Sequence, residues 1–258
     1  MTEPLRRLSH TQVQMFVRCP QQYEYRYLRG LKVPPGAGLV KGKAYDFVCN
    51  ADYTEKMKTG KDIRLSEWRD LAAEGWKAAM DDSGGEVNWG SKDAGSTQHE
   101  LSGHVVRFFA DIAPNVHPVA VQQQVEREGF LGYIDVIDDE TRIRDNKAKG
   151  KMMGGHEPDK DLQPTAYAYA LNASIDFVFD VTTPNKAASL GTSRDMADVA
   201  AYARLLDKVR AAIKTGIFVP NPTSNLCSPT WCGFWDRCDR GGTRWFTPAK
   251  EGELIFTG

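Results

Sequence analysis

Two aspartates and a lysine stand near the middle of the chain in a pattern suited to phosphate chemistry. Asp135 ends the run Gly-Tyr-Ile-Asp, and Asp145-Asn146-Lys147 follows ten residues later. A phosphodiester is anionic and repels hydroxide, so its hydrolysis needs a hard cation that neutralises the phosphate and acidifies a water molecule. Carboxylate oxygens suit Mg²⁺ or Mn²⁺. These residues therefore predict a metal site held by Asp135 and Asp145, with the Asn146 carbonyl as a further ligand and Lys147 as the catalytic amine.

Two predicted strands would position this group. Apolar and polar residues alternate over 130–137 and 141–148, and the polar run 138–141 supplies the turn between them. Side chains two apart on a strand point the same way, so Asp145 and Lys147 converge, and pairing of the strands can bring Asp135 alongside. The alternative interpretation is a surface hairpin with solvated charges.

A helix is predicted to follow, over 163–172. Gln163 and Tyr167 lie one turn apart on one of its faces, and both can form hydrogen bonds. Without further context, a helix packed through Tyr167 explains the same pattern.

Taken together, the motifs of this chain resemble one branch of a nuclease superfamily. In chain order they are Leu8-Ser9, Arg18-Cys19-Pro20, Gly42 to Asp46, Gly132 to Asp135, Asp145 to Lys147, Gln163 to Tyr167 and three clustered cysteines. Each motif is weak, but the ordered set is similar to the RecB-like branch of the PD-(D/E)xK superfamily. Within that branch it most resembles the iron–sulfur exonucleases, which include AddB nuclease domains and the CRISPR-associated Cas-four type.

The resemblance implies a fold, an activity and a set of roles. The fold would be a restriction-endonuclease-like mixed α/β sheet flanked by helices. The activity would be metal-dependent trimming of DNA from single-stranded or duplex ends, alongside recombination, helicase or CRISPR adaptation proteins, in the cytoplasm of a prokaryotic or phage-infected cell. The roles would be metal binding by the two acids, catalysis by the lysine, and site support and DNA contact by the helix, carried here by Asp135, Asp145, Lys147, Gln163 and Tyr167.

One position departs from the family pattern. The family usually has a histidine four residues after the glycine equivalent to Gly42, and this chain has Asp46 there. A carboxylate can also bind metal, and its hard oxygen favours Mg²⁺ over softer ions. The departure also motivates a second hypothesis, a catalytically silent or partner-activated DNA-binding subunit of a DNA-processing complex.

Four of the five cysteines match the iron–sulfur pattern of the family. They are Cys19, Cys227, Cys232 and Cys238, and four thiolates are what a [4Fe–4S] cluster requires. The loop between Cys227 and Cys232 is two residues longer than the commonest version. Such a cluster would join the N- and C-terminal segments, 1–41 and 220–258, of one nuclease domain spanning 1–258.

Other readings of the cysteines remain open. A structural Zn²⁺ site uses similar ligands, but it usually pairs two short C-x-x-C knuckles. Disulfides need an oxidising compartment, and the N-terminal residues lack the apolar core of a signal peptide. Cys49 lies outside the set and is expected to pack as a small apolar residue.

Composition fits a globular enzyme. The 258 residues can bury a substantial core, and 41% hydrophobic with 26% charged residues is ordinary for such a protein. No apolar run approaches the roughly 20 residues that span a bilayer. The net charge of −1 argues against nonspecific coating of DNA.

Apolar periodicity predicts further helices near 42–58, 65–81, 97–113 and 195–215, and further strands near 117–127 and 176–182.

Overall fold

The computed structural model describes residues 7–64 and 66–238, which form two compact units. The first unit contains residues 7–10 and Pro34–Lys208. The second contains Thr11–Val33 and residues 209–238. The acid–amine motifs therefore lie in the first unit, whereas Cys19 and the C-terminal cysteines lie in the second.

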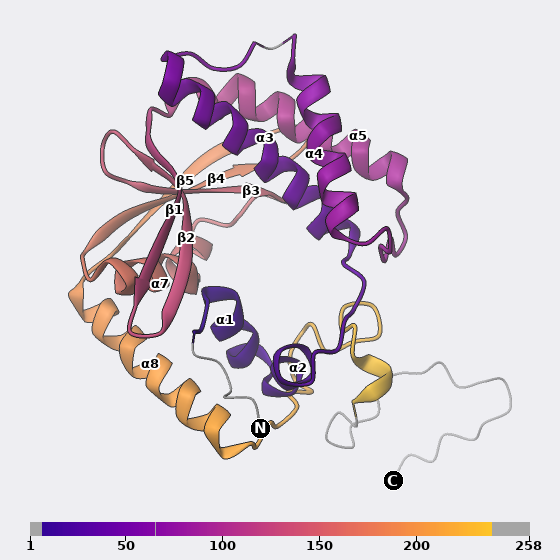
Figure 1. Cartoon of the computed structure of the whole chain (residues 1–258), viewed down its shortest axis with the longest axis vertical. Coiled ribbons are helices and arrows are strands. Elements are labelled where there is room, and N and C mark those ends of the chain that lie inside the picture. Colours follow the sequence, from indigo (N-terminus) through magenta and orange to yellow (C-terminus); the bar gives the residue numbers. More distant parts are fainter. Residues whose placement is uncertain (1–6, 65, 239–258) are drawn as a thin grey trace, which may run out of the picture. The chain divides into compact units, whose positions relative to one another are not determined.

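The first unit is built on a five-stranded mixed sheet (Figure 1). Neighbouring strands follow chain order, and all pairs are antiparallel except the parallel pair β3–β4. Parallel strands need a crossover, which here contains helix α7 (Leu162–Leu171). The mixed α/β class expected from the sequence is confirmed. The strands are β1 (Pro118–Arg127), β2 (Phe130–Asp138), β3 (Ile143–Ala148), β4 (Ile175–Thr182) and β5 (Ala187–Arg194).

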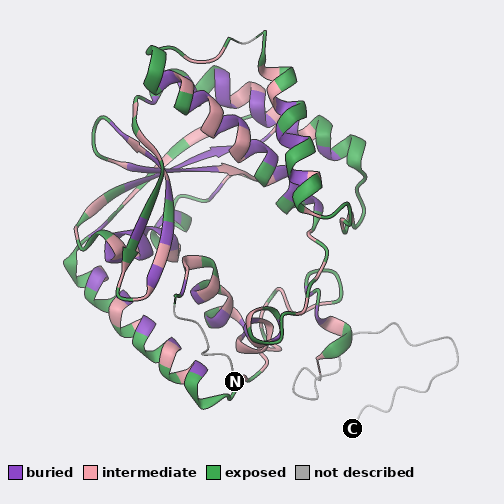
Figure 2. Cartoon of the chain, viewed as in Figure 1, coloured by how far each residue is buried: buried purple, intermediate pink, exposed green. Residues whose placement is uncertain are grey.

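Two apolar clusters pack on this sheet. Helices α3 (Ala37–Thr59), α4 (Trp68–Asp82) and α5 (Ala94–Arg107) form one cluster, which includes Val136 of β2. Tyr167 of α7 belongs to the other, together with Phe177 and Phe179 of β4. Figure 2 shows the central strands largely buried. Burial of β3 explains why its polar side chains must find partners inside the protein.

The remaining elements are shorter or lie toward the ends of the described chain. They are α1 (His10–Arg18), α2 (Pro20–Tyr23), η1 (Glu24–Leu28), η2 (Phe108–Ile112), η3 (Ala113–Asn115), α6 (Glu157–Lys160), α8 (Met196–Thr215) and η4 (Trp235–Arg237). No helix within 7–64 and 66–238 is long and apolar enough to cross a membrane.

Most predicted elements appear close to their expected bounds, with three differences. Helix α3 begins at Ala37 rather than near residue 42. The helix expected over 97–113 is regular only as far as Arg107 and continues as the π-helical turn η2. Strand β5 was not predicted, because its sequence Ala-Ala-Ser-Leu-Gly-Thr-Ser-Arg has low β propensity. It forms because all of its residues pair with β4 in an antiparallel ladder.

A buried histidine on α5 gives a pH prediction for this unit. His104 is fully buried, with Nδ1 3.0 Å from Thr182 Oγ1, and burial followed by the charge of Lys41 lowers its pKa to about 4. The unfolded chain takes up this proton near pH 6.5, so the free energy of unfolding falls as pH drops from 6.5 toward 4. We expect His104→Gln to lose about 2 kcal/mol less over this range than the unsubstituted protein. Urea unfolding at both ends of the range measures this, and identical pH dependence in the two proteins would contradict it.

Candidate active site and cysteine cavity

The register of the central strands brings the two predicted acids together. Val136 of β2 pairs with Arg144 of β3, so the antiparallel register places Asp135 opposite Asp145. Asp145 is 3% exposed, and Asp135 is half-buried. The two carboxylates therefore lie side by side on adjacent strands of the sheet.

Lys147 and Gln163 complete a small network around Asp145. Lys147 Nζ lies 2.7 Å from Asp145 Oδ2 and donates to Gln163 Oε1 at 3.1 Å. The Gln163 amide in turn donates to Asp145 Oδ1. Gln163 is held at the start of α7, where its backbone N–H donates a hydrogen bond to the side chain of the N-cap residue Asp161. The lysine is thus fixed from two sides while its side chain stays 31% exposed.

Tyr167 supports the strand that carries Asp135. Its hydroxyl donates to the Tyr133 carbonyl at 2.5 Å, two residues before Asp135, and its ring stacks on Phe177. A Cβ at Gly132 would lie 3.1 Å from Tyr167 Cε1. The glycine of the Gly-Tyr-Ile-Asp motif therefore lets α7 approach β2 closely.

Asp46 approaches the same group from helix α3. It is half-buried, and its charge interacts with those of Asp135, Asp145 and Lys147. The helix begins at Ala37, before the start expected near Gly42, so Asp46 lies well inside it. One region of the first unit therefore contains Asp46, Asp135, Asp145, Lys147 and Gln163.

The pKa values reflect crowded negative charge. Burial, followed by the charge of Asp145, raises the pKa of Asp135 to about 7. Burial, followed by Asp135 and Asp145, raises the pKa of Asp46 well above its ordinary value. Burial alone would lower the pKa of Lys147, but the three carboxylates outweigh it and raise that pKa. The lysine is therefore a cation at neutral pH, and it does not by itself neutralise the three acids.

This donor set suits a hard divalent cation. Positive charge among the carboxylates would relieve the repulsion that raises the pKa values of Asp46 and Asp135. In the described part of the chain, no three His, Cys, Asp or Glu side chains are arranged around one point so as to hold a metal ion. Mg²⁺ does not need three, because it keeps several waters and commonly binds one or two carboxylates. Asp135 and Asp145 fit that requirement.

Asn146 lies between Asp145 and Lys147 on β3. Its side chain is buried and lies 3.4 Å from the Tyr53 hydroxyl of α3. Because alternate residues of a strand face opposite sides, this contact leaves only the backbone carbonyl of Asn146 as a candidate ligand.

Two further side chains at the site were not predicted from sequence. Gln122 of β1 donates to Asp135 Oδ1 at 3.1 Å and to Asn50 Oδ1 of α3 at 3.2 Å. Neither residue belongs to a motif, and Gln122 stands in a run of three glutamines. Only the pairing of β1 with β2 distinguishes it from its neighbours.

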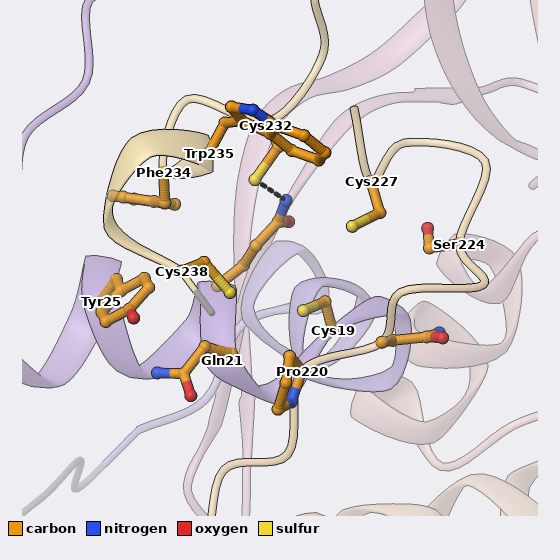
Figure 3. Close-up of a pocket in the computed structure, with 12 residues that line it drawn as sticks. Cys19, Gln21, Tyr25, Pro220, Ser224, Cys227, Cys232, Phe234, Trp235 and Cys238 are labelled. Atoms are coloured by element: carbon orange, nitrogen blue, oxygen red, sulfur yellow. Dashed lines mark hydrogen bonds between the residues drawn. The ribbon is translucent and has the colours of Figure 1, made fainter. Parts of the chain in front are cut away.

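In the second unit, the four expected cysteines line one cavity (Figure 3). Cys19 lies between α1 and α2, whereas Cys227, Cys232 and Cys238 come from the C-terminal segment. Phe234 and Trp235 also line the cavity, and the Gln22 amide donates to Cys232 Sγ at 3.2 Å. None of the five cysteines, which all lie in the described part of the chain, forms a disulfide, and Cys49 is fully buried in the first unit as expected for a core residue.

The thiols of this cavity can be compared with the ligands of two kinds of metal centre. Around one tetrahedral Zn²⁺, thiolate sulfurs lie only about 3.8 Å apart, and no such grouping occurs among the residues that the structure describes. The thiolates of a [4Fe–4S] cluster bind different iron atoms and so stand farther apart. The cavity supplies four thiols, apolar rings and an N–H donor to sulfur, and four thiolates is the number that such a cluster binds.

Two solved structures and one family model are similar to this chain over most of its length. A crystal structure from Eubacterium rectale, of a protein named "Putative exonuclease", covers 95% of this chain and 91% of its own, with 11% identity and a TM-score of 0.51. The crystal structure of SSO0001 covers 92% and 88%, with 14% identity and a TM-score of 0.41. No curated protein gives a significant match. The family model of the PD-(D/E)XK nuclease superfamily matches residues 7–239. The chain therefore belongs to the PD-(D/E)XK nuclease superfamily.

Proposed function

We propose that this protein is a metal-dependent exonuclease that hydrolyses phosphodiester bonds from DNA ends. The observation that carries the proposal is the contact of Lys147 with both Asp145 and Gln163, opposite Asp135. A lysine held between an acid and an amide has a defined position, which a solvated hairpin would not give it. The family model spans residues of both units, so we treat 1–258 as one nuclease domain.

Each residue has a distinct task in the proposed reaction. Asp135, Asp145 and the Asn146 carbonyl would hold Mg²⁺ or Mn²⁺, with Asp46 nearby. When bound, the cation would neutralise phosphate charge and acidify water. Water attacks phosphorus in line, one P–O bond forms, and the bond to the leaving oxygen breaks. The proton that the attacking water releases to solvent is balanced by protonation of the leaving oxygen. Lys147 stabilises the negative charge that develops on the phosphate oxygens.

Supporting residues keep these groups in place. Gln163 fixes both Asp145 and Lys147, so the amine stays within reach of the phosphate. Tyr167 ties α7 to β2 through the Tyr133 carbonyl. Such positioning removes motions that would otherwise oppose reaction.

Cleavage of end-labelled linear DNA tests the proposal. Single- and double-stranded substrates are incubated with anaerobically purified protein and Mg²⁺ or Mn²⁺, beside covalently closed circles and a chelator control. An exonuclease shortens the linear DNA progressively, spares the circles and stops with chelator. Cutting of circles would show that the activity is endonucleolytic rather than exonucleolytic. No cleavage of any substrate would contradict the proposal that the protein is a nuclease.

The cysteine cavity supports a second component, a [4Fe–4S] cluster with a structural role. Cluster binding would stabilise the second unit, because metal-binding energy is also folding energy. We expect about four irons per chain and broad absorbance near 400 nm in anaerobic protein. Cys227→Ser should lose most of the iron and lower the melting temperature.

Cys49→Ala is the matched control for the cluster. This thiol is fully buried on α3 and does not line the cavity. It should keep its iron content. A colourless protein that contains zinc after anaerobic purification would instead support the structural Zn²⁺ reading.

A second function is kept because of Asp46. Its raised pKa and its place beside the two acids leave open a site that cleaves only with a partner, such as a recombination, helicase or CRISPR adaptation protein. Folded, cluster-loaded protein that binds DNA ends without cutting them would favour this subunit role. Cutting by the isolated protein would exclude it.

A further inference from the structure

Gln122 occupies an unusual backbone conformation directly beside the active site. Its φ is +51°, in the left-handed region that residues other than glycine, asparagine and aspartate rarely adopt. The β1–β2 ladder pairs Val121 with Val136 and Gln123 with Ile134, so Gln122 stands opposite Asp135. Strained residues of this kind persist where the surrounding structure requires them, and they cluster at functional sites.

The two strands change their packing side at this point. Val136 packs with the cluster of α3, α4 and α5, whereas Ile134, only two residues earlier, packs with the cluster of α7. On β1, Val121 and Val125 divide between the same two clusters, although residues four apart on a regular strand share a face. The left-handed residue Gln122 therefore lies where the packing of the two strands changes from one cluster to the other.

The side chain of Gln122 joins three elements. Its amide nitrogen has two hydrogens, and its two acceptors are Asp135 Oδ1 on β2 and Asn50 Oδ1 on α3. Asn50 lies one helical turn after Asp46 on α3. One amide thus links the strand that carries Asp135 to the helix that carries Asp46.

We propose that Gln122 is a positioning residue that orients the Asp135 carboxylate for metal binding. This inference rests on the proposed nuclease function and adds a residue to its site. A carboxylate rotates about its terminal torsion, and an N–H bound to Oδ1 fixes that rotation. The other oxygen is then left for the cation, and hydrogen-bonding partners of metal ligands commonly change metal affinity 10- to 100-fold.

Two substitutions separate the backbone from the amide. Gln122→Gly keeps the left-handed conformation without strain but removes the side chain. Gln122→Met keeps the length of the side chain but removes both donors. Gln123→Met is the matched control, because Gln123 is the next residue of β1, is also exposed and pairs with Ile134 rather than Asp135.

Binding of Mn²⁺, followed by electron paramagnetic resonance, and thermal unfolding without metal give readouts independent of cleavage. We expect both Gln122 variants to bind Mn²⁺ about 10-fold more weakly, with Gln122→Gly at least as stable as the unsubstituted protein. Cleavage should need about 10-fold more metal and recover at saturation. Gln123→Met should match the unsubstituted protein in every measurement.

The outcomes distinguish this inference from the proposed function. Unchanged Mn²⁺ affinity in both Gln122 variants, in a protein that binds metal and cleaves DNA, overturns the positioning role alone. Loss of Mn²⁺ binding only in proportion to loss of stability assigns Gln122 to the fold instead. An unsubstituted protein that neither binds Mn²⁺ nor cleaves DNA overturns both proposals.

Discussion

Replacing Lys147 by alanine is expected to slow DNA cleavage by about three orders of magnitude, the typical effect of removing a group that stabilises developing charge. The amine lies 2.7 Å from Asp145 Oδ2 and 3.1 Å from Gln163 Oε1, so its position is set by the protein. Its raised pKa keeps it charged at neutral pH. Single-turnover cleavage of labelled DNA at saturating metal measures the loss.

Two further variants make this result specific to the site. Lys77→Ala removes an exposed lysine of α4 and should leave the cleavage rate unchanged. Lys147→Arg keeps the charge but changes the shape of the cation, and should recover only a small part of the activity. Full activity in folded Lys147→Ala would remove the lysine from the mechanism and, with it, the main support for the proposed reaction.

Replacing Arg144 by methionine is expected to lower the free energy of unfolding by about 3–5 kcal/mol, because it leaves the buried Asp180 carboxylate without its cation. Arg144 binds both oxygens of Asp180 at 2.8 Å, and its Nη1 donates to Asp138 Oδ2 at 3.0 Å. These three side chains are 5%, 0% and 1% exposed. Because Arg144 immediately precedes Asp145 on β3, its loss should also disturb the active site.

Arg142 is the matched control for this prediction. It also pairs with Asp138, at 2.8 Å, but its side chain is 31% exposed. Arg142→Met should therefore cost no more than about 1 kcal/mol, the usual size of an exposed ion pair. Chemical unfolding of both variants gives the comparison. Equal losses would show that burial does not determine the strength of these pairs.

The strands and the acid–amine pair were predictable from sequence because their signals are local. Alternation of residue types gave β2 and β3, and the two-residue period of a strand placed Asp145 and Lys147 on one face. Their contact at 2.7 Å follows directly from that period. The helix that carries Gln163 was equally visible, since its residues have high helix propensity around Ala166 and Ala168.

Other features depended on partners distant in sequence. The strand β5 has little intrinsic β propensity and forms through its ladder with β4. Arg144 belongs to none of the motifs seen in the sequence, and it is buried because Asp180 and Asp138 pair with it inside the protein. No sequence pattern gives the pairing of one arginine with two acids on other strands.

By itself, the sequence determined the mixed α/β class, the family motifs and the residue types that a phosphate-cleaving site needs. The tertiary structure decided which side chains surround those residues. It set Asp145 opposite Asp135 through strand register, and it placed Gln122 between Asp135 and Asn50 through a left-handed residue in β1. The physical reason is that periodicity fixes the direction of a side chain within one element, whereas a contact between elements depends on how all of them pack.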